Sequence, residues 1–259
     1  MNKPERDSAD QEEVEAEKSG SAFWETVRTI VYAVLIALVV RTFAYEPFNI
    51  PSGSMKPTLL VGDYLFVSKY AYGYSRYSFP FNFPPFQGRV FGDKPEQGDV
   101  AVFKLPRDNK TDYIKRIIGM PGDKIQVVEG VLHINGQAVK REKVEIQLTK
   151  DYAGFPVTIT QYIETLPNGR THYIWEESDN ERFDNTPIYE VPPGHYFAMG
   201  DNRDHSLDSR AREVSYVPYE NLVGRAGVIF FSHNSSASLW EIWKWPQAIR
   251  FGRIGDVVE

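Results

Sequence analysis

The chain has 259 residues, of which 42% are hydrophobic and 14% aromatic, and it contains no cysteine. Its 29 basic and 35 acidic side chains give a formal net charge of −6 at pH 7, which offers no electrostatic support for nucleic-acid binding. The absence of cysteine excludes a disulfide framework, a thiolate metal site and a cysteine nucleophile. The length allows one domain with a substantial core, alone or with an appendage.

The N-terminal part changes from polar to strongly apolar. Residues 1–22 are acidic and almost free of large apolar side chains, which predicts a solvated, disordered tail. Ile30–Val40 then carries no charge and is bounded by Arg28 and Arg41. That run is too short to cross a bilayer, but a helix over residues 23–44 is long enough, and both arginines can reach the interfaces. We therefore expect one transmembrane helix over residues 23–44.

Two other interpretations of this segment stay open. It can be a buried helix of a soluble protein, because the charge-free run is short. It can also be a cleaved secretory signal, although no Ala-x-Ala-like site follows it and the preceding tail is acidic rather than basic. The cations Lys3, Arg6, Lys18 and Arg28 favour a cytoplasmic N-terminus.

Beyond the expected span, short apolar segments alternate with turn signals, as is typical of β-strands. Asn135-Gly136 and Asn168-Gly169 predict hairpin turns. We therefore predict a mainly β fold, an antiparallel sheet or barrel-like domain over residues 45–259 with a small inserted β-hairpin region at about 141–190. The expected strands are Asp63–Lys69, Gly98–Lys104, Tyr113–Ile118, Lys124–Val128, Val131–Ile134, Tyr196–Met199 and Gly227–Phe231.

Aromatic residues concentrate in the segment 70–91, where they alternate with prolines. Such a proline density excludes a central strand. The segment is therefore either an exposed loop that dips into the membrane interface or a loop packed over the barrel. Trp240, Trp243 and Trp245 raise the same two alternatives.

A serine and a lysine form the first candidate for chemistry. Ser54 lies beside Gly53 in a proline-flanked loop, which presents a hydroxyl in a fixed place. Lys115 lies in an apolar strand and shares one face with Tyr113 and Ile117. Burial can lower a lysine pKa by up to ~3–5 units, and a neutral amine can then take the serine proton without any histidine. The alternative is an edge-strand lysine whose ammonium reaches solvent.

The segment Gly200–Arg210 is rich in glycine, aspartate, asparagine and arginine, which indicates a polar turn held by its own hydrogen bonds. It lacks the glycine and terminal glutamate positions of an EF-hand loop, so we expect no metal there. We interpret it as a support loop whose hydroxyls orient the lysine.

Three motifs together resemble the conserved boxes of bacterial type I signal peptidases, in the same order and over about residues 28–230. They are Ser52-Gly53-Ser54-Met55 after the expected span, Tyr113–Arg116 followed by Gly119–Asp123, and Gly200–Arg210. The combination is highly specific, whereas Ser-Gly-Ser-Met alone would not be.

The resemblance implies roles for individual residues. Ser54 would be the nucleophile and Lys115 the general base. The Ser54 N–H and the Ser52 hydroxyl would form the oxyanion hole, and Ser206 would hydrogen-bond the lysine amine. Structural support is implied for Arg116, Asp208 and Arg210.

The resemblance also implies a membrane-bound enzyme that removes signal peptides from secretory preproteins, cutting after small residues at positions −3 and −1. It would need no cofactor and no metal. Its partners would be preproteins and the lipid bilayer, without nucleic acid, and it would act as a monomer. The expected location is the plasma (inner) membrane, single-pass, with a cytoplasmic tail over residues 1–22 and the catalytic domain, residues 45–259, on the outer or periplasmic face.

Three other functions are alternatives to this interpretation. A Ser-His-Asp hydrolase would use His205 or His195, but no Gly-x-Ser-x-Gly elbow is present. A membrane-tethered β-domain that binds exported chains would share the anchor and the strands, yet would not need Ser52, Ser54 and Lys115 together. A self-cleaving repressor with a Ser–Lys dyad would carry a DNA-binding module, which the sequence lacks.

Overall fold

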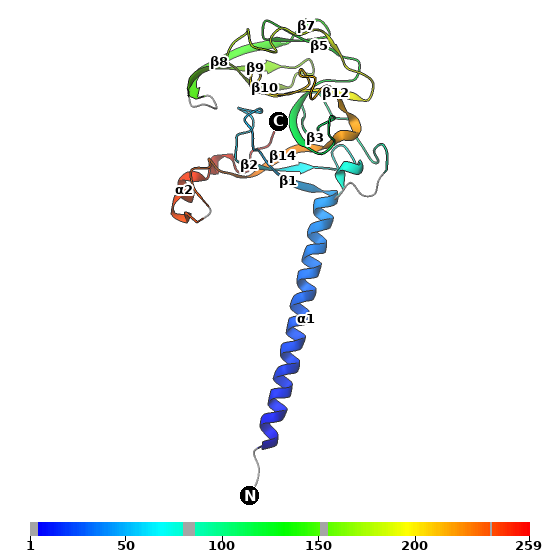
Figure 1. Cartoon of the computed structure of the whole chain (residues 1–259), viewed down its shortest axis with the longest axis vertical. Coiled ribbons are helices and arrows are strands. Elements are labelled where there is room, and N and C mark those ends of the chain that lie inside the picture. Colours follow the sequence, from blue (N-terminus) through cyan, green and yellow to red (C-terminus); the bar gives the residue numbers. More distant parts are fainter. Residues whose placement is uncertain (1–4, 80–85, 151–154, 239) are drawn as a thin grey trace.

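One long helix extends from a β-domain (Figure 1). The computed structural model describes residues 5–79, 86–150, 155–238 and 240–259, with side chains from residue 23 onward apart from that of Lys150. Helix α1 runs without a break from Glu5 to Phe43. Where the sequence predicts a disordered tail, the chain is therefore helical from Glu5, and the abundance of Glu, Ala and Lys, all good helix formers, accounts for this.

The apolar part of α1 has no protein packed against it. Its segment Phe23–Phe43 is 21 residues long with a mean hydropathy of 1.8, and none of its 18-residue apolar window is buried. A core helix of a soluble domain would be mostly covered, so that alternative does not describe this segment. An apolar helix of this length matches the ~30 Å hydrocarbon core of a bilayer.

A seven-stranded antiparallel sheet forms the part of the β-domain nearest α1 (Figure 1). It combines strands from both ends of the chain, since β14 pairs with β2 and β3. In sheet order its strands are β1 (Tyr45–Asn49), β2 (Asp63–Ser68), β14 (Leu222–Ser232), β3 (Val100–Lys104), β4 (Asp112–Gly119), β12 (His195–Met199) and β13 (Val217–Pro218).

Two smaller antiparallel sheets lie beyond the large one. The first contains β11 (Tyr189–Glu190), β5 (Lys124–Val128), β6 (Val131–Ile134) and β7 (Gln137–Ala138). The second contains β10 (Thr171–Glu176), β9 (Pro156–Thr165) and β8 (Lys140–Lys150), and lies on the side of the domain away from α1 (Figure 1). The remaining helices are short: η1 (Arg76–Ser78), η3 (Tyr219–Asn221), η4 (Ile242–Lys244), α2 (Trp245–Ala248) and η5 (Phe251–Arg253).

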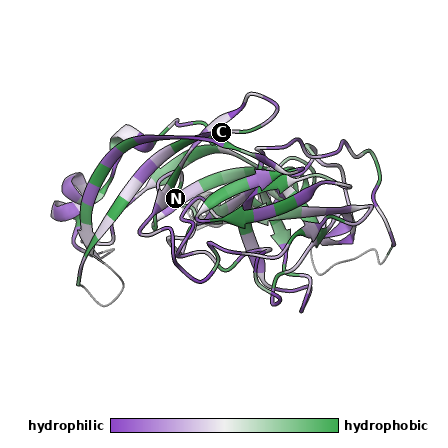
Figure 2. Cartoon of the chain, turned by 90° about the horizontal axis from the view of Figure 1, so that it is seen from above, coloured by the Kyte–Doolittle hydropathy of each residue, from purple (hydrophilic) through white to green (hydrophobic). Residues whose placement is uncertain are grey.

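The prediction of a mainly antiparallel β fold is confirmed, and all seven expected strands lie within or overlap observed ones. Both hairpin signals also lie at hairpin turns, with Asn135 and Gly136 at φ of 54° and 79° between β6 and β7. Along several strands, hydrophobic and polar residues alternate (Figure 2). Period-two patterning of this kind identified strands buried on one face, such as β5 and β6, whereas β3 and β12 are buried along most of their length and stand out as short apolar runs.

The aromatic segment 70–91 divides between the core and the surface. Tyr72 and Tyr77 are buried, whereas Tyr70 and Phe91 are exposed. Its central part, residues 80–85, lies outside the described residues. Near the C-terminus, Trp240, Trp243 and Trp245 are all exposed.

Candidate active site

A tight turn after β1 holds Ser54 in place. The amide of Lys56 donates to Gly53 O at 3.1 Å, and that of Leu59 donates to Met55 O at 2.8 Å. Met55 and Leu59 are fully buried in the apolar cluster beneath the large sheet. With its neighbour anchored in the core, Ser54 keeps a fixed position and is only 8% exposed.

The side chain of Lys115 reaches this serine from β4. Its Nζ lies 2.6 Å from Ser54 Oγ and 3.0 Å from the carbonyl oxygen of Ile114. On the same strand face, the Tyr113 ring lies 5.4 Å from the amine, as the strand period predicts. The lysine is 4% exposed, so the alternative of an ammonium in solvent is wrong.

The surroundings of Lys115 shift its protonation equilibrium toward the neutral form. Burial lowers the pKa of Lys115 from 10.5 to about 8, while the nearby carboxylates of Asp208 and Asp201 raise it and so limit the effect. A lysine with such a pKa is partly neutral near pH 7, so it can accept a proton from a hydroxyl group.

Two hydrogen-bond donors lie beside the Ser54 hydroxyl. Ser52 Oγ lies 3.4 Å from Ser54 Oγ, and Ser52 itself is exposed. Among the residues that the structure describes, none accepts a hydrogen bond from the Ser54 N–H. Both donors are therefore available to an atom bound at the serine.

Ser206 is close to this site but does not contact the amine as expected. Its hydroxyl is buried and, within the described part of the chain, lacks a well-formed hydrogen bond. It approaches the serine loop at Gly200, where a Cβ would lie 2.5 Å from both Ser206 Cβ and the Ser54 carbonyl oxygen. Gly200 is therefore needed for this close approach.

The loop Gly200–Arg210 holds the serine loop through two hydrogen bonds. Asn202 donates from its backbone N–H to Ser54 O at 3.1 Å and from Nδ2 to Gly53 O at 3.0 Å. The sequence motif contains Asn202, but nothing in the sequence indicates which loop its amide contacts. The contact of Asn202 with the serine loop was therefore not predicted from the sequence.

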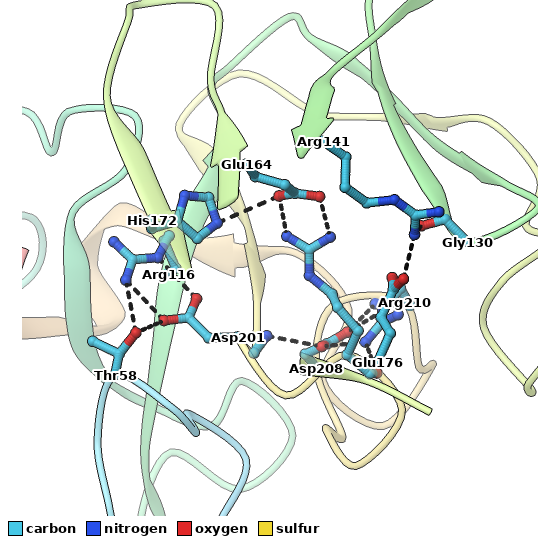
Figure 3. A network of polar contacts seen from close by, with 12 residues as sticks. Thr58, Arg116, Gly130, Arg141, Glu164, His172, Glu176, Asp201, Asp208 and Arg210 are labelled. Atoms are coloured by element: carbon cyan, nitrogen blue, oxygen red, sulfur yellow. Dashed lines mark hydrogen bonds and ion pairs between the residues drawn. The ribbon is translucent and has the colours of Figure 1, made fainter. Parts of the chain in front are cut away.

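A buried ion pair fixes the start of that loop against β4. The guanidinium of Arg116 binds both carboxylate oxygens of Asp201 at 2.8 Å, and Thr58 donates to the same carboxylate at 2.5 Å (Figure 3). Burial alone would raise the pKa of Asp201, but Arg116 more than offsets it, so the pKa lies below its usual value. Arg116 thus supports the site from the strand face opposite Lys115.

A second buried pair closes the end of the loop. Arg210 donates to both carboxylate oxygens of Asp208 at 2.9 Å, and the Gly200 N–H donates to Asp208 at 3.0 Å. Burial raises the pKa of Asp208, yet Arg210 outweighs it and the net pKa is lowered. Asp208 therefore ties the two ends of the loop together.

The three-stranded sheet supports the same loop from outside, which the sequence did not predict. Trp175 of β10 exchanges backbone hydrogen bonds with Asp201 and Arg203 at 2.9 Å each. Arg203 pairs with both carboxylate oxygens of Glu164 on β9, and His172 lies beside that glutamate (Figure 3). Both members of the pair are almost completely buried. No local signal marks Glu164, because its partner is 39 residues away.

A groove with a volume of about 630 Å³ leads to the serine and the lysine. Residues of β1 and of the first half of β4 line it. β1 is an edge strand of its sheet, and Asp112 to Lys115 have no partner on the β12 side among the described residues. Two strand edges thus border the groove, and an extended peptide can pair with such edges.

The histidines named in the rival interpretation have other contacts. His205 lines the groove, and its Nε2 contacts the Glu177 carboxylate. His195 lies at the start of β12, with Nδ1 3.0 Å from the carbonyl oxygen of Pro193. Within the described residues no three His, Asp or Glu side chains are grouped so as to hold a metal ion.

A family model and curated relatives agree on one family. The family model described as "Signal peptidase, peptidase S26" matches residues 23–231. A signal peptidase I from Rickettsia typhi is 39% identical over 256 residues, covering 92% of this chain and 94% of that protein. Another from Rickettsia akari is 40% identical over 242 residues, covering 86% and 88%. A solved signal peptidase I from Enterococcus faecalis is 27% identical and covers 51% of this chain and 97% of its own, with a TM-score of 0.32.

Proposed function

The chain belongs to the signal peptidase family, peptidase S26, and from that premise we propose that it is a membrane-bound serine endopeptidase using a Ser54–Lys115 dyad. Its substrates would be secretory preproteins, from which it removes the N-terminal signal peptide. The observation that carries the dyad is the contact of 2.6 Å between Lys115 Nζ and Ser54 Oγ inside a buried environment.

The acylation step follows from this contact. The neutral amine of Lys115 takes the proton of Ser54 Oγ, and the oxygen attacks the carbonyl carbon of the scissile peptide bond. The Ser54 N–H and the Ser52 hydroxyl donate to the resulting oxyanion. One such donor is worth about 10²–10³ in rate. As the tetrahedral intermediate collapses, the Lys115 ammonium gives its proton to the leaving amine, and the signal peptide remains esterified to Ser54.

Deacylation repeats the same proton transfers with water. Lys115, again neutral, takes a proton from a water molecule that attacks the ester carbonyl. The proton then returns to Ser54 Oγ, which releases the carboxylate end of the signal peptide. Histidine is not needed at any step, because Lys115 accepts and returns each proton. No aspartate is needed to orient the base, because an amine has no tautomer to be fixed.

The support residues hold this geometry without touching the substrate. We propose that Arg116, Asp208 and Arg210 keep the loop Gly200–Arg210 against the serine turn, through the ion pairs described above. Ser206 is proposed as a second hydrogen-bond partner of the Lys115 amine. Its hydroxyl is buried beside the serine turn, and it lies close enough to Asp208 to help lower the pKa of that carboxyl, which supports a place next to the charged groups around Lys115.

The substrate would bind as an extended strand between the open edges of β1 and β4. Alternate side chains of a strand point the same way, so residues −1 and −3 would both face the groove wall, and by family membership we propose small side chains at these two positions. We further propose that the apolar part of α1 anchors the enzyme in the plasma membrane. Residues 1–22 would then be cytoplasmic and residues 45–259 would form a monomeric catalytic domain on the outer face, without nucleic-acid partners.

The test is cleavage of a preprotein with an Ala-x-Ala site by the detergent-solubilised full chain. Ser54→Ala and Lys115→Met are each expected to abolish cleavage while the thermal unfolding curve remains cooperative. Full activity of Lys115→Met would remove the proposed base. Preprotein binding without cleavage by the wild type would instead favour the tethered binding module.

A further inference from the structure

A second cavity lies where α1 meets the β-domain, and we call it the junction pocket. Its volume is about 510 Å³, and it is bordered by Leu38 and Arg41 from the last turns of α1 together with residues of the large sheet and its loops. The junction is held firmly, since the Tyr74 hydroxyl donates to Phe43 O at 2.6 Å and the Lys69 N–H donates to Ala44 O at 3.0 Å. The pocket therefore has a defined position relative to the helix.

The junction pocket carries an excess of two positive charges. Its lining includes four cations (Arg41, Lys69, Lys104 and Lys110) and two carboxylates (Glu46 and Asp112). Lys69 is bound to Glu46 at 2.8 Å, and Lys104 is bound to Asp112 at 2.8 Å. The other two cations have N–H donors that are not used in ion pairs. The Arg41 side chain is 63% exposed and makes one ion pair, of 3.2 Å, with Glu46. The Lys110 ammonium pairs with no carboxylate in the described chain. An anion would therefore be attracted here.

The pocket is also partly apolar, and it lies at a particular depth. Leu38, Phe48 and Phe79 contribute apolar surface beside the cations. The apolar stretch of α1 runs from Phe23 to Phe43, so Arg41 lies within its last turn. In a bilayer of ordinary thickness this is the level at which hydrocarbon gives way to headgroups. Cations beside apolar surface at that depth match an anionic amphiphile better than a soluble anion.

We propose that the junction pocket binds the phosphate of an anionic phospholipid, whose acyl chains lie along Leu38 and the adjoining face of α1. This inference rests on the membrane anchoring proposed above. Arg41 and Lys110 supply the donors to the phosphate oxygens. The junction pocket and the substrate groove share Glu46, Phe48 and Asp112, so the bound lipid contacts residues that also border the groove.

Lipid affinity tests the proposal directly. The full chain in zwitterionic detergent micelles is titrated with fluorescent phosphatidylglycerol or phosphatidylcholine, and binding is followed by anisotropy. Because each cation near a membrane surface contributes a few-fold to affinity, Arg41→Gln with Lys110→Gln is expected to weaken phosphatidylglycerol binding about 30-fold. The matched control, Lys124→Gln with Arg212→Gln, removes two exposed cations of the β-domain outside the pocket and is expected to change binding less than about twofold.

Three results would overturn the proposal: equal affinity for the two lipids, equal weakening by both double variants, or release of the lipid by inorganic phosphate at millimolar concentration. Membrane retention after alkaline washing and preprotein cleavage are measured in parallel. A wild-type chain that is washed off the membrane or fails to cleave refutes the proposed function itself, whereas an anchored, active enzyme without lipid preference refutes only the lipid site.

Discussion

The protonation of Lys115 makes the most demanding prediction, namely the dependence of cleavage on pH. The base acts only in its neutral form, and the pKa of Lys115 is about 8 instead of 10.5. About one molecule in ten is then active at pH 7, against about one in 3,000 for an ordinary lysine. We expect kcat/KM to fall about tenfold per pH unit below about pH 8 and to level off above it.

The assay is a fluorogenic peptide with an Ala-x-Ala site and no titratable group near the scissile bond. Initial rates at low peptide concentration, between pH 6 and 10, give the kcat/KM profile of the free enzyme. His205→Gln serves as the control, because His205 also lines the groove. Its profile is expected to coincide with that of the wild type.

Two results would refute this reasoning. A rate that keeps rising to pH 10 would mean that the lysine is not desolvated in the working enzyme. An acid limb near the ordinary histidine value of about 6.5 that disappears in His205→Gln would identify a histidine as the base.

Three further predictions concern stability and packing. At pH 7 the free energy of unfolding of Lys115→Met is expected to exceed that of the wild type by up to about 3 kcal/mol, because burial penalises the protonated amine. The pKa of Lys115 is lower in the folded than in the unfolded protein, so this difference shrinks as the pH rises from about 8 to 10.5. Glu164→Gln is expected to cost about 3–5 kcal/mol in urea unfolding and to reduce cleavage, because Arg203 keeps its charge in a buried site. Gly200→Ala is expected to lower kcat in the peptide assay and to cost about 1–3 kcal/mol, because its Cβ would press on the Ser54 carbonyl and on Ser206.

Each of these predictions has an outcome that would contradict it, and two of them have a matched control variant. A Lys115→Met protein less stable than wild type at pH 7 would contradict the desolvation of the amine. Glu142→Gln removes an exposed carboxylate on β8, and a loss equal to that of Glu164→Gln would mean that burial of the pair is unimportant. Gly252→Ala places a methyl group in open space, so Gly200→Ala should differ clearly from it, and identical behaviour would disprove the close approach.

Most of the longer strands were predictable because they are short apolar or alternating segments bounded by turn residues. Strands such as β5 and β6 were identified to the residue, since turn residues bound them. The helical start of α1 was missed, because an acidic composition indicates solvation and does not by itself distinguish a helix from a disordered tail. Short pairings such as β13 carry too few residues to show any pattern.

The candidate site divides in a similar way. Ser54 and Lys115 stand out in the sequence, because a serine in a stiff turn and a lysine in an apolar strand are unusual. The residue that Asn202 binds and the burial of the Glu164–Arg203 pair could not be predicted, because they depend on contacts between segments far apart in the chain.

Residue type and local periodicity are enough to identify the chemical groups, the apolar segment able to span a membrane and the strand pattern. The folded structure adds that Lys115 is buried within 2.6 Å of Ser54 and that its pKa lies near 8. It also brought four cations together where α1 meets the β-domain. The reason is physical: desolvation and charge attraction act through space, and the distances between strands exist only once the sheets have formed.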